Sequence, residues 1–183
     1  MRIIVGITGS SGALFGVQFL KQAPPEKYLI VSRWGKAILK DETGLTEGDL
    51  APFVTQTFSD ADLAAPYSSG SNRFDAFVII PCSTSTLGKI AAGISDTLIT
   101  RVANVALKER RRLVICLRET PLSTVTLENA ARLSRDGVVI MPIAPPMYVH
   151  PQSIADIARG FADKVLGVLG IRETPGWRSE DIE

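Results

Sequence analysis

Short apolar runs alternate along the chain with segments in which apolar residues recur at helical spacing. Apolar runs rich in β-branched residues predict strands near 2–7, 28–31, 77–80, 113–117 and 138–141. Helical spacing predicts helices near 12–22, 35–43, 83–92, 97–111, 124–134 and 153–169. The strand runs are almost continuously hydrophobic, which is typical of parallel strands covered on both faces. The pattern therefore predicts a doubly wound α/β domain with a mainly parallel sheet.

Two segments do not follow this alternation. The region 46–72 contains Pro52 and Pro66 and ends in the turn-rich run Ser68-Ser69-Gly70-Ser71-Asn72, so we expect a loop or short elements there, with a lid over the site as one role. The tail from 173 to 183 is strongly polar and contains Pro175. We expect it on the surface or against a neighbouring subunit.

Composition removes several classes of function. Twenty Lys and Arg residues stand against 19 Asp and Glu residues, so the chain lacks the basic surplus that favours a nucleic-acid partner. No run approaches the roughly 18 apolar residues of a membrane span, and the amino-terminal residues lack the pattern of a secretory signal, so we expect a cytoplasmic protein without membrane contact. Cys82 and Cys116 are isolated in the sequence and predict neither a disulfide nor a metal site.

A basic run, Lys108-Glu109-Arg110-Arg111-Arg112, follows the predicted helix 97–111. Cations at a helix C-terminus complement the helix dipole. We interpret Arg110 to Arg112 as the solvated end of that helix.

Candidate chemistry lies at the strand ends, where doubly wound sheets bind their ligands. The first strand leads into Thr8-Gly9-Ser10-Ser11-Gly12, a turn that is either simply tight or open to a phosphate at the helix N-terminus. Its glycines are spaced GxxGxxG rather than GxGxxG, and the second strand ends in Ser32-Arg33 without an acid to bind a ribose. Both features favour a mononucleotide over a nicotinamide dinucleotide.

The later strand ends carry hydroxyl, charged and aromatic residues. The third strand leads into Ser83-Thr84-Ser85-Thr86, which suits either a helix cap or a flavin nucleotide. The fourth leads into Arg118-Glu119, which is either a catalytic pair or a surface ion pair. The fifth leads into a stiff loop with four prolines that carries Tyr148 and His150, and such a lone histidine is more often an ordinary surface residue than a base.

At these strand ends the chain resembles the UbiX-type flavin prenyltransferases, earlier described as aromatic-acid decarboxylases. The resemblance implies a Rossmann-like or flavodoxin-like single domain over residues 1–183. The matching stretches are GITGSSGA (6–13), SGS (69–71), PCSTSTL (81–87), TRVANVALKERRRLVICLRETPLS (100–123) and APPMYVHPQSIADI (144–157).

The resemblance implies a reaction as well as a fold. The dimethylallyl group of dimethylallyl phosphate would be joined to N5 and then C6 of reduced FMN, without a metal. The prenylated FMN would serve a partner decarboxylase, and the enzyme would assemble as a homododecamer. The helix that carries Arg101 and Lys108 would reach into a neighbouring subunit's site.

Site residues also follow from the resemblance, position by position. Ser11 would hydrogen-bond near N5 with Glu42, and Glu119 would protonate the departing phosphate. The catalytic positions are Ser11, Glu42, Lys108 and Glu119; the flavin contacts are Gly9, Ser10, Ser11, Ser32, Ser83, Thr84, Ser85, Thr86 and Arg118; the prenyl phosphate contacts are Arg101, Lys108, Tyr148 and Lys164.

The chain departs from the family pattern at a few positions. Lys164 stands where many members have Arg, Met147 stands where Phe is common, and Val149-His150 replaces a common His-Arg or His-Gln pair. Two other functions remain as alternatives: an FMN-binding carrier or subunit, and a direct aromatic-acid decarboxylase. The related cysteine decarboxylases are disfavoured, because the chain has PCSTST in place of their PASANT-like stretch and no histidine before His150.

Overall fold

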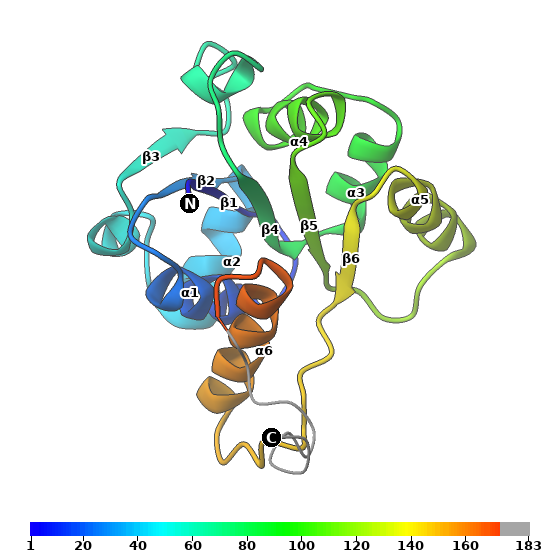
Figure 1. Ribbon diagram of the computed structural model, residues 1–183. Helices are drawn as coiled ribbons and strands as arrows, with labels where there is room; N and C mark the ends of the chain where they lie inside the picture. Colours follow the sequence, from blue (N-terminus) through cyan, green and yellow to red (C-terminus); the bar gives the residue numbers. More distant parts are fainter. Residues whose placement is uncertain (173–183) are drawn as a thin grey trace.

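The structure is a computed structural model that describes residues 1–172. Six parallel strands form one sheet in the order β3-β2-β1-β4-β5-β6 (Figure 1). This arrangement confirms the predicted doubly wound α/β fold; the expectation for the tail 173–183 lies outside the described residues. The strands are β1 (Ile3–Ile7), β2 (Lys27–Val31), β3 (Gln56–Ser59), β4 (Ala76–Cys82), β5 (Arg112–Leu117) and β6 (Val139–Pro142).

Helices cover both faces of the sheet (Figure 1). One face carries α1 (Ala13–Gln22), α2 (Arg33–Thr43) and α6 (Ile154–Val168), and the other carries α3 (Thr84–Ala91), α4 (Leu98–Lys108) and α5 (Thr124–Arg135). Successive strand residues point to opposite faces, so Ile4 packs into the core under α3 and α4 whereas Val5 packs into the core under α1 and α6. Each apolar strand therefore contributes to two cores.

Hydroxyl caps fix where most of the helices begin. Ser32, Ser83, Thr97, Ser123 and Ser153 each accept a hydrogen bond from a backbone N–H in the first turn of the helix that follows. The first helix, α1, differs, because its N-cap is Gly12 with φ of 98° and no side chain of its own. This terminus is satisfied from elsewhere, as described below.

The sheet has one more strand than the apolar runs predict. The segment 46–72 contains β3, flanked by the 3₁₀ turns Gly48–Phe53 and Pro66–Ser68. Only Phe58 of β3 is buried, since the strand lies at the edge of the sheet, and a single apolar residue leaves no run to recognise. Tyr67 is also buried and packs edge-on against the Phe58 ring. These contacts place the segment in the framework rather than in a lid.

The interpretation of Arg110 to Arg112 as a solvated helix end is wrong. The α4 helix ends at Lys108, Arg110 adopts a left-handed conformation with φ of 55°, and Arg112 is already the first residue of β5. Arg111 donates hydrogen bonds to the carbonyls of Gly70 and Asn72. The basic run therefore forms a tight turn between α4 and β5. The turn is short because Arg112 already pairs with Ala76 of β4 in the sheet.

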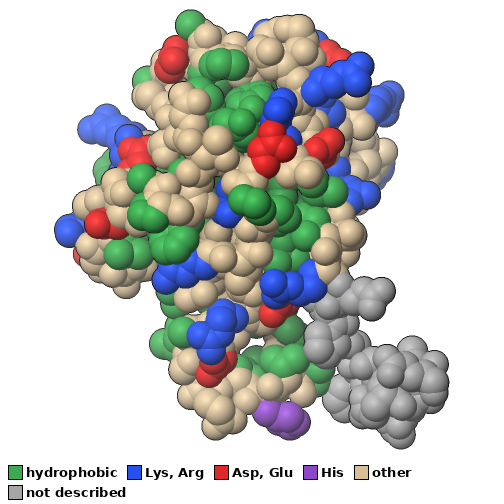
Figure 2. All heavy atoms as spheres, turned by 60° about the vertical axis from the view of Figure 1, so that its left-hand side comes forward, with side chains coloured by type: hydrophobic (Ala, Val, Ile, Leu, Met, Phe, Trp, Pro, Cys, Tyr) green, Lys and Arg blue, Asp and Glu red, His purple; other side chains and the backbone are tan. Residues whose placement is uncertain are grey.

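Within residues 1–172, no helix is both long and apolar enough to cross a membrane. On the face drawn in Figure 2, acidic and basic side chains are interspersed.

Candidate active site

Hydrogen bonds from the Thr8 side chain and from the backbone tie together the carboxyl ends of the central strands. Thr8, which follows β1, donates through its hydroxyl to the carbonyl of Pro81 and accepts from the Ser83 N–H at 2.8 Å. The Arg118 N–H, directly after β5, donates to the carbonyl of Cys82 at 3.0 Å. The turns that carry the predicted site residues are thus held at one edge of the sheet.

The N-terminus of α1 is occupied by a carboxylate of the protein itself. Glu42, near the end of α2, accepts hydrogen bonds from the Gly12 N–H at 2.8 Å and the Ala13 N–H at 2.9 Å. The expectation that the turn 8–12 offers these N–H groups to a phosphate is therefore wrong. An anion does bind the positive end of this helix, but the anion is Glu42.

Burial alone would raise the pKa of Glu42. Hydrogen bonds from the Ser11 side chain and from the Ala13 and Gly12 N–H groups, together with the positive charge of Arg118, outweigh burial and lower the pKa below its ordinary value. Glu42 is therefore an ionised acceptor that orients the Ser11 hydroxyl, since a carboxylate can only accept from it.

A cavity of about 270 Å³ opens between the ends of β1 and β4, where the strand order reverses. We call it the strand-end cavity. Its wall includes the first residues of α2, α3 and α4, so the positive ends of these helices converge on one space. The lining residues are Gly9, Ser32, Arg33, Trp34, Asp60, Ser83, Ser85, Thr86, Lys89, Thr97, Ile99 and Thr100.

Some hydroxyl groups of this cavity cap helices, and others line its wall without capping. Ser32 caps α2 through the Gly35 N–H, and Ser83 caps α3 while also contacting the Thr86 hydroxyl at 3.0 Å. Ser85 is exposed on the cavity wall one residue into the helix. Ser83 thus has the capping role weighed for the run 83–86, while Ser85 and Thr86 line the cavity beside it.

The turn after β1 has two features that fit a bound flavin nucleotide. The Ser10 hydroxyl is buried and has no hydrogen-bond partner among the described residues, which is costly unless a ligand supplies one. Gly9 lets the backbone pass close to α2, since a Cβ there would lie 2.4 Å from the Cβ of Trp34. The residues present therefore fit a mononucleotide whose phosphate faces the helix N-termini.

Several cavity residues are missing from the sequence-based site. Asp60 follows β3 and accepts the Ile99 N–H at 2.9 Å; burial raises the pKa of its carboxyl, with hydrogen bonds from Ile99 and Thr97 opposing the shift. Trp34 is 68% exposed and Lys89 lines the wall farther along α3. Recognising β3 would have identified Asp60 as a strand-end residue, whereas no sequence signal distinguishes Lys89.

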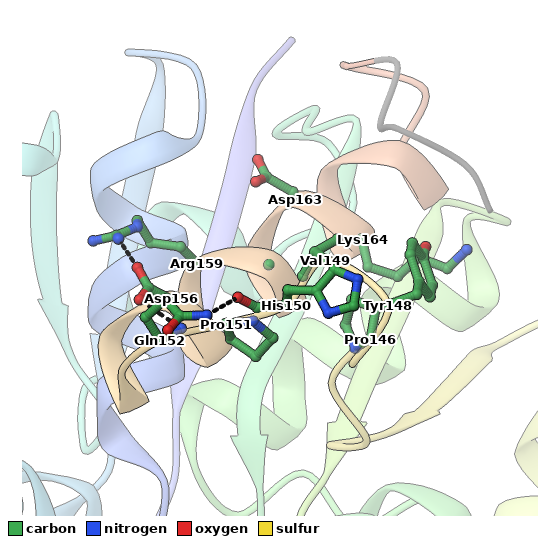
Figure 3. A pocket seen from close by; sticks show the side chains of 11 residues that line it. Pro146, Tyr148, Val149, His150, Pro151, Gln152, Asp156, Arg159, Asp163 and Lys164 are labelled. Carbon is green, nitrogen blue, oxygen red and sulfur yellow. Dashed lines mark hydrogen bonds and ion pairs between the residues drawn. The ribbon is translucent and has the colours of Figure 1, made fainter. Parts of the chain in front are cut away.

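A second hollow of about 430 Å³, which we call the loop pocket, lies between the loop after β6 and α6 (Figure 3). Tyr148 and Lys164 lie on one side of it, and Asp156 with its ion-pair partner Arg159 on the other. Asp163 is paired with Arg172, whereas Lys164 forms no ion pair among the described residues. The loop pocket therefore brings together the two predicted prenyl phosphate ligands with an uncommitted positive charge.

His150, the chain's single histidine, also lines the loop pocket and lies at the surface (Figure 2). Its backbone is left-handed, with φ of 50°, and its carbonyl accepts the Gln152 side-chain amide at 2.8 Å. His150 is exposed, which is the surface location expected for it.

Arg118 and Glu119 lie on the exposed loop after β5. The Arg118 side chain approaches Gly12, and Glu119 accepts the N–H of Thr120 at 3.0 Å. The two residues do not form an ion pair with each other in the described chain, so the surface-pair alternative is wrong. The Ile143 N–H donates to the Leu117 carbonyl, which joins the start of the loop 142–153 to this strand end.

Arg101 and Lys108 do not join these groups within one chain. Lys108 ends α4 just before β5 begins, so it lies at the amino edge of the sheet, opposite the loop after β6 (Figure 1). Its ammonium pairs with Glu109 at 2.6 Å, next to Gly70. Arg101 donates to the carbonyl of Ser68 at 2.9 Å. Both cations thus lie beside the Ser-Gly-Ser turn 69–71, on an exposed surface.

Among residues 1–172, no three His, Cys, Asp or Glu side chains converge as a metal site would require. The two cysteines are fully buried, and burial raises the pKa of both thiols. Neither is a nucleophile in this arrangement.

Comparisons with known proteins agree with this geometry. The Flavoprotein family model matches residues 1–166. The chain is 44% identical over 172 residues to a protein of Thermoplasma acidophilum named Flavin prenyltransferase UbiX, and the match covers 93% of this chain and 96% of that protein.

Two solved structures share the fold over almost the whole chain. A dodecameric FMN-dependent UbiX-like decarboxylase of Escherichia coli O157:H7 superposes with a TM-score of 0.92 at 42% identity, covering 98% of this chain and 100% of the other. AnUbiX (PadA1), solved in complex with FMN and dimethylallyl pyrophosphate, superposes with a TM-score of 0.91 at 37% identity, covering 97% and 98%.

Proposed function

The chain belongs to the UbiX-type flavin prenyltransferase family of flavoproteins, and from this premise we propose that it joins the dimethylallyl group of dimethylallyl phosphate to reduced FMN. Reduced FMN would supply a nucleophilic N5, which would lose its proton and take the prenyl carbon as the C–O bond to phosphate breaks. Its C6 would then add to the prenyl double bond and close a fourth ring, as the double bond gains a proton and C6 loses one. The protein's own residues bind the two substrates, hold them together and move protons.

The observation that carries the proposal is the convergence of three helix N-termini on the strand-end cavity. Exposed N–H groups and positive helix ends favour the phosphate of a mononucleotide. With the phosphate in the cavity, the flavin ring would lie beside the adjoining turn 8–12. This turn carries the unpartnered Ser10 hydroxyl and Ser11, the partner of Glu42. Ser32, the run 83–86 and Arg118 would complete the flavin contacts.

Ser11 and Glu42 would act on the proton at N5. The Ser11 hydroxyl donates to the ionised Glu42 carboxylate, so its oxygen keeps a lone pair to accept a proton from a ligand N–H. The low pKa of Glu42 makes it an anchor that orients Ser11 and accepts a proton only transiently.

The donor's phosphate would bind in the loop pocket to Tyr148 and Lys164. Lys164 is uncommitted, whereas the nearby Asp156 and Asp163 are neutralised by arginines, so an incoming anion meets net positive charge. Glu119 would protonate the phosphate as it departs, and the cations would stabilise the negative charge that develops on it.

Arg101 and Lys108 would serve this site from a second copy of the chain. Within one chain Lys108 lies at the far edge of the sheet and Arg101 donates to the Ser68 carbonyl, and both side chains are exposed where a neighbour can reach them. A related enzyme of 42% identity is dodecameric, which supports an assembly that brings these edges together. We accordingly propose a homododecamer in which each site combines residues of neighbouring subunits.

The prenylated FMN would pass to a partner decarboxylase. An FMN carrier that forms no bond is the main alternative, and it is disfavoured because storage requires the strand-end cavity but neither Glu119 nor the loop pocket. A direct aromatic-acid decarboxylase is the other alternative, and the Escherichia coli relative is named a UbiX-like decarboxylase. This function is disfavoured because the described site lacks a dedicated group for releasing carbon dioxide.

Anaerobic incubation of the protein with FMNH2 and dimethylallyl phosphate tests the proposal directly. Mass analysis of the released flavin should find FMN enlarged by one five-carbon unit, with equimolar inorganic phosphate formed. Unmodified FMN in the presence of bound donor would instead support the carrier. Carbon dioxide release from an aromatic acid by the protein alone would support the decarboxylase.

A further inference from the structure

Lys89 is one of two cations that line the strand-end cavity among the described residues, the other being Arg33. The Arg33 guanidinium lies over the indole of Trp34, 5.8 Å from the ring centre. A phosphate monoester carries a charge of about −1.5 to −2 near pH 7, which hydroxyls and helix ends neutralise only in part. A further cation at the phosphate would complete this neutralisation, and Lys89 lines the cavity.

The helix geometry directs Lys89 toward the phosphate end of the cavity. Ser85 and Lys89 are four residues apart on α3, so they share a face, and both line the cavity. Side chains on a helix lean toward its N-terminus. The ammonium of Lys89 can thus span the single turn of about 5.4 Å that separates it from the exposed Ser85.

Asp96 now holds the Lys89 ammonium. The two groups form an ion pair at 2.6 Å, and the hydrogen bond from Lys89 lowers the pKa of Asp96. Asp96 lies just before the Thr97 cap of α4 and does not line the cavity. Side-chain exposures of 41% and 48% make this a weak surface pair, which a phosphate dianion can displace.

We propose that Lys89 turns from Asp96 to the phosphate of FMN and thereby makes the protein select the phosphorylated flavin over riboflavin. The inference rests on the proposed function only in requiring that FMN binds in the strand-end cavity. Asp96 acts as a competitor that holds the lysine in place when the cavity contains no phosphate. Removing the Lys89 charge should therefore weaken FMN binding, whereas removing the Asp96 charge should tighten it.

The experiment measures dissociation constants for FMN and for riboflavin, by flavin fluorescence at fixed ionic strength, in the wild type and four variants. Lys89→Gln should weaken FMN binding about fivefold to tenfold and leave riboflavin within about twofold. Lys89→Arg should retain most FMN affinity, and Asp96→Asn should tighten FMN binding about twofold to threefold. Lys36→Gln is the matched control, because Lys36 forms a similar exposed pair with Glu47 at 2.5 Å outside this cavity.

Different results overturn different statements. If Lys89→Gln bound FMN as the wild type does, or weakened FMN and riboflavin equally, Lys89 would have no role at the phosphate. If Asp96→Asn weakened FMN, the competition between the two anions would be refuted. A wild-type protein that bound neither flavin would refute the proposed function itself and this inference with it.

Discussion

The strand-end cavity is walled by helix N-termini and strand ends, whereas the loop pocket is walled by a proline-rich loop and exposed side chains of α6. Around the cavity, polar groups are fixed by caps and by Thr8, which joins β1 to β4. Around the pocket, Tyr148 and Lys164 are exposed, and the backbone at His150 is left-handed. The strand-end cavity is therefore formed by the helices and strands of the fold, whereas the loop pocket is formed largely by a surface loop.

The two substrates of the proposed reaction would therefore depend on different parts of the structure. The proposed flavin site needs only the sheet and the helices that begin at its edge, which one chain provides. The proposed prenyl transfer would also need Arg101 and Lys108, which lie beside the turn 69–71 and do not line the loop pocket within one chain. We therefore expect variants to separate flavin binding from chemistry.

The largest expected effect is at Glu119. Glu119→Gln should reduce prenyl transfer about 10²-fold to 10⁴-fold, because the amide keeps the shape of the side chain but cannot protonate the departing phosphate. FMN binding should remain at the wild-type level, since the strand-end cavity is unchanged. The rate is measured anaerobically with saturating flavin. Wild-type rates in Glu119→Gln would remove Glu119 as the acid and make Lys108 or Tyr148 the next candidates.

A mixing experiment tests whether the two regions meet through assembly. Lys108→Met and Glu119→Gln should each be nearly inactive alone. If each site combines residues of two chains, random co-assembly of the two variants from a denatured mixture should restore about a quarter of the sites. Unmixed, separately refolded variants are the control. No recovery, despite oligomers of wild-type mass in light scattering, would place both residues in the same chain's site or exclude Lys108 from it.

A smaller effect is expected at Ser83, within the strand-end cavity. Ser83→Ala removes the cap of α3 and a candidate flavin contact, so FMN affinity should fall up to about tenfold while the rate at saturating flavin changes little. Thermal unfolding should also show a loss of about 1 kcal/mol from the missing cap. Ser123→Ala, which removes the equivalent cap of α5 away from the cavity, is the matched control. Equal effects of both variants on FMN affinity would contradict a direct contact.

The smallest effect concerns the pH dependence of stability. The pKa of Glu42 is lower in the folded protein than its ordinary value, so ionised Glu42 stabilises the fold above that value and the contribution is lost as the pH falls below it. Solvent screening at this exposed residue keeps the contribution below about 1 kcal/mol. Chemical unfolding of wild type and Glu42→Gln should converge at acid pH and differ near neutrality. A constant difference at all pH values would contradict the assignment.

Much of the fold and part of the site could be predicted from the sequence, for identifiable reasons. Five strands have the continuous apolar runs that burial on both faces requires, so the sequence predicts where each of them lies along the chain. β3 was not, because an edge strand buries little and only Phe58 marks it. Asp60 was missed with it. The turn 8–12 was recognised as special, but Glu42 comes from another helix, and no local pattern indicates that a carboxylate occupies this N-terminus.

From the sequence alone came the alternation of strands and helices, the carboxyl edge of the sheet as the place of the candidate site, and the family. These follow from local periodicity and from motifs that are contiguous in the chain. The tertiary structure was needed to see which helix ends face the strand-end cavity, that Lys89 lines it, and that α4 ends at the edge opposite the loop after β6. The reason is physical: strand order and helix direction set the distances between residues far apart in sequence, and periodicity carries no information about them.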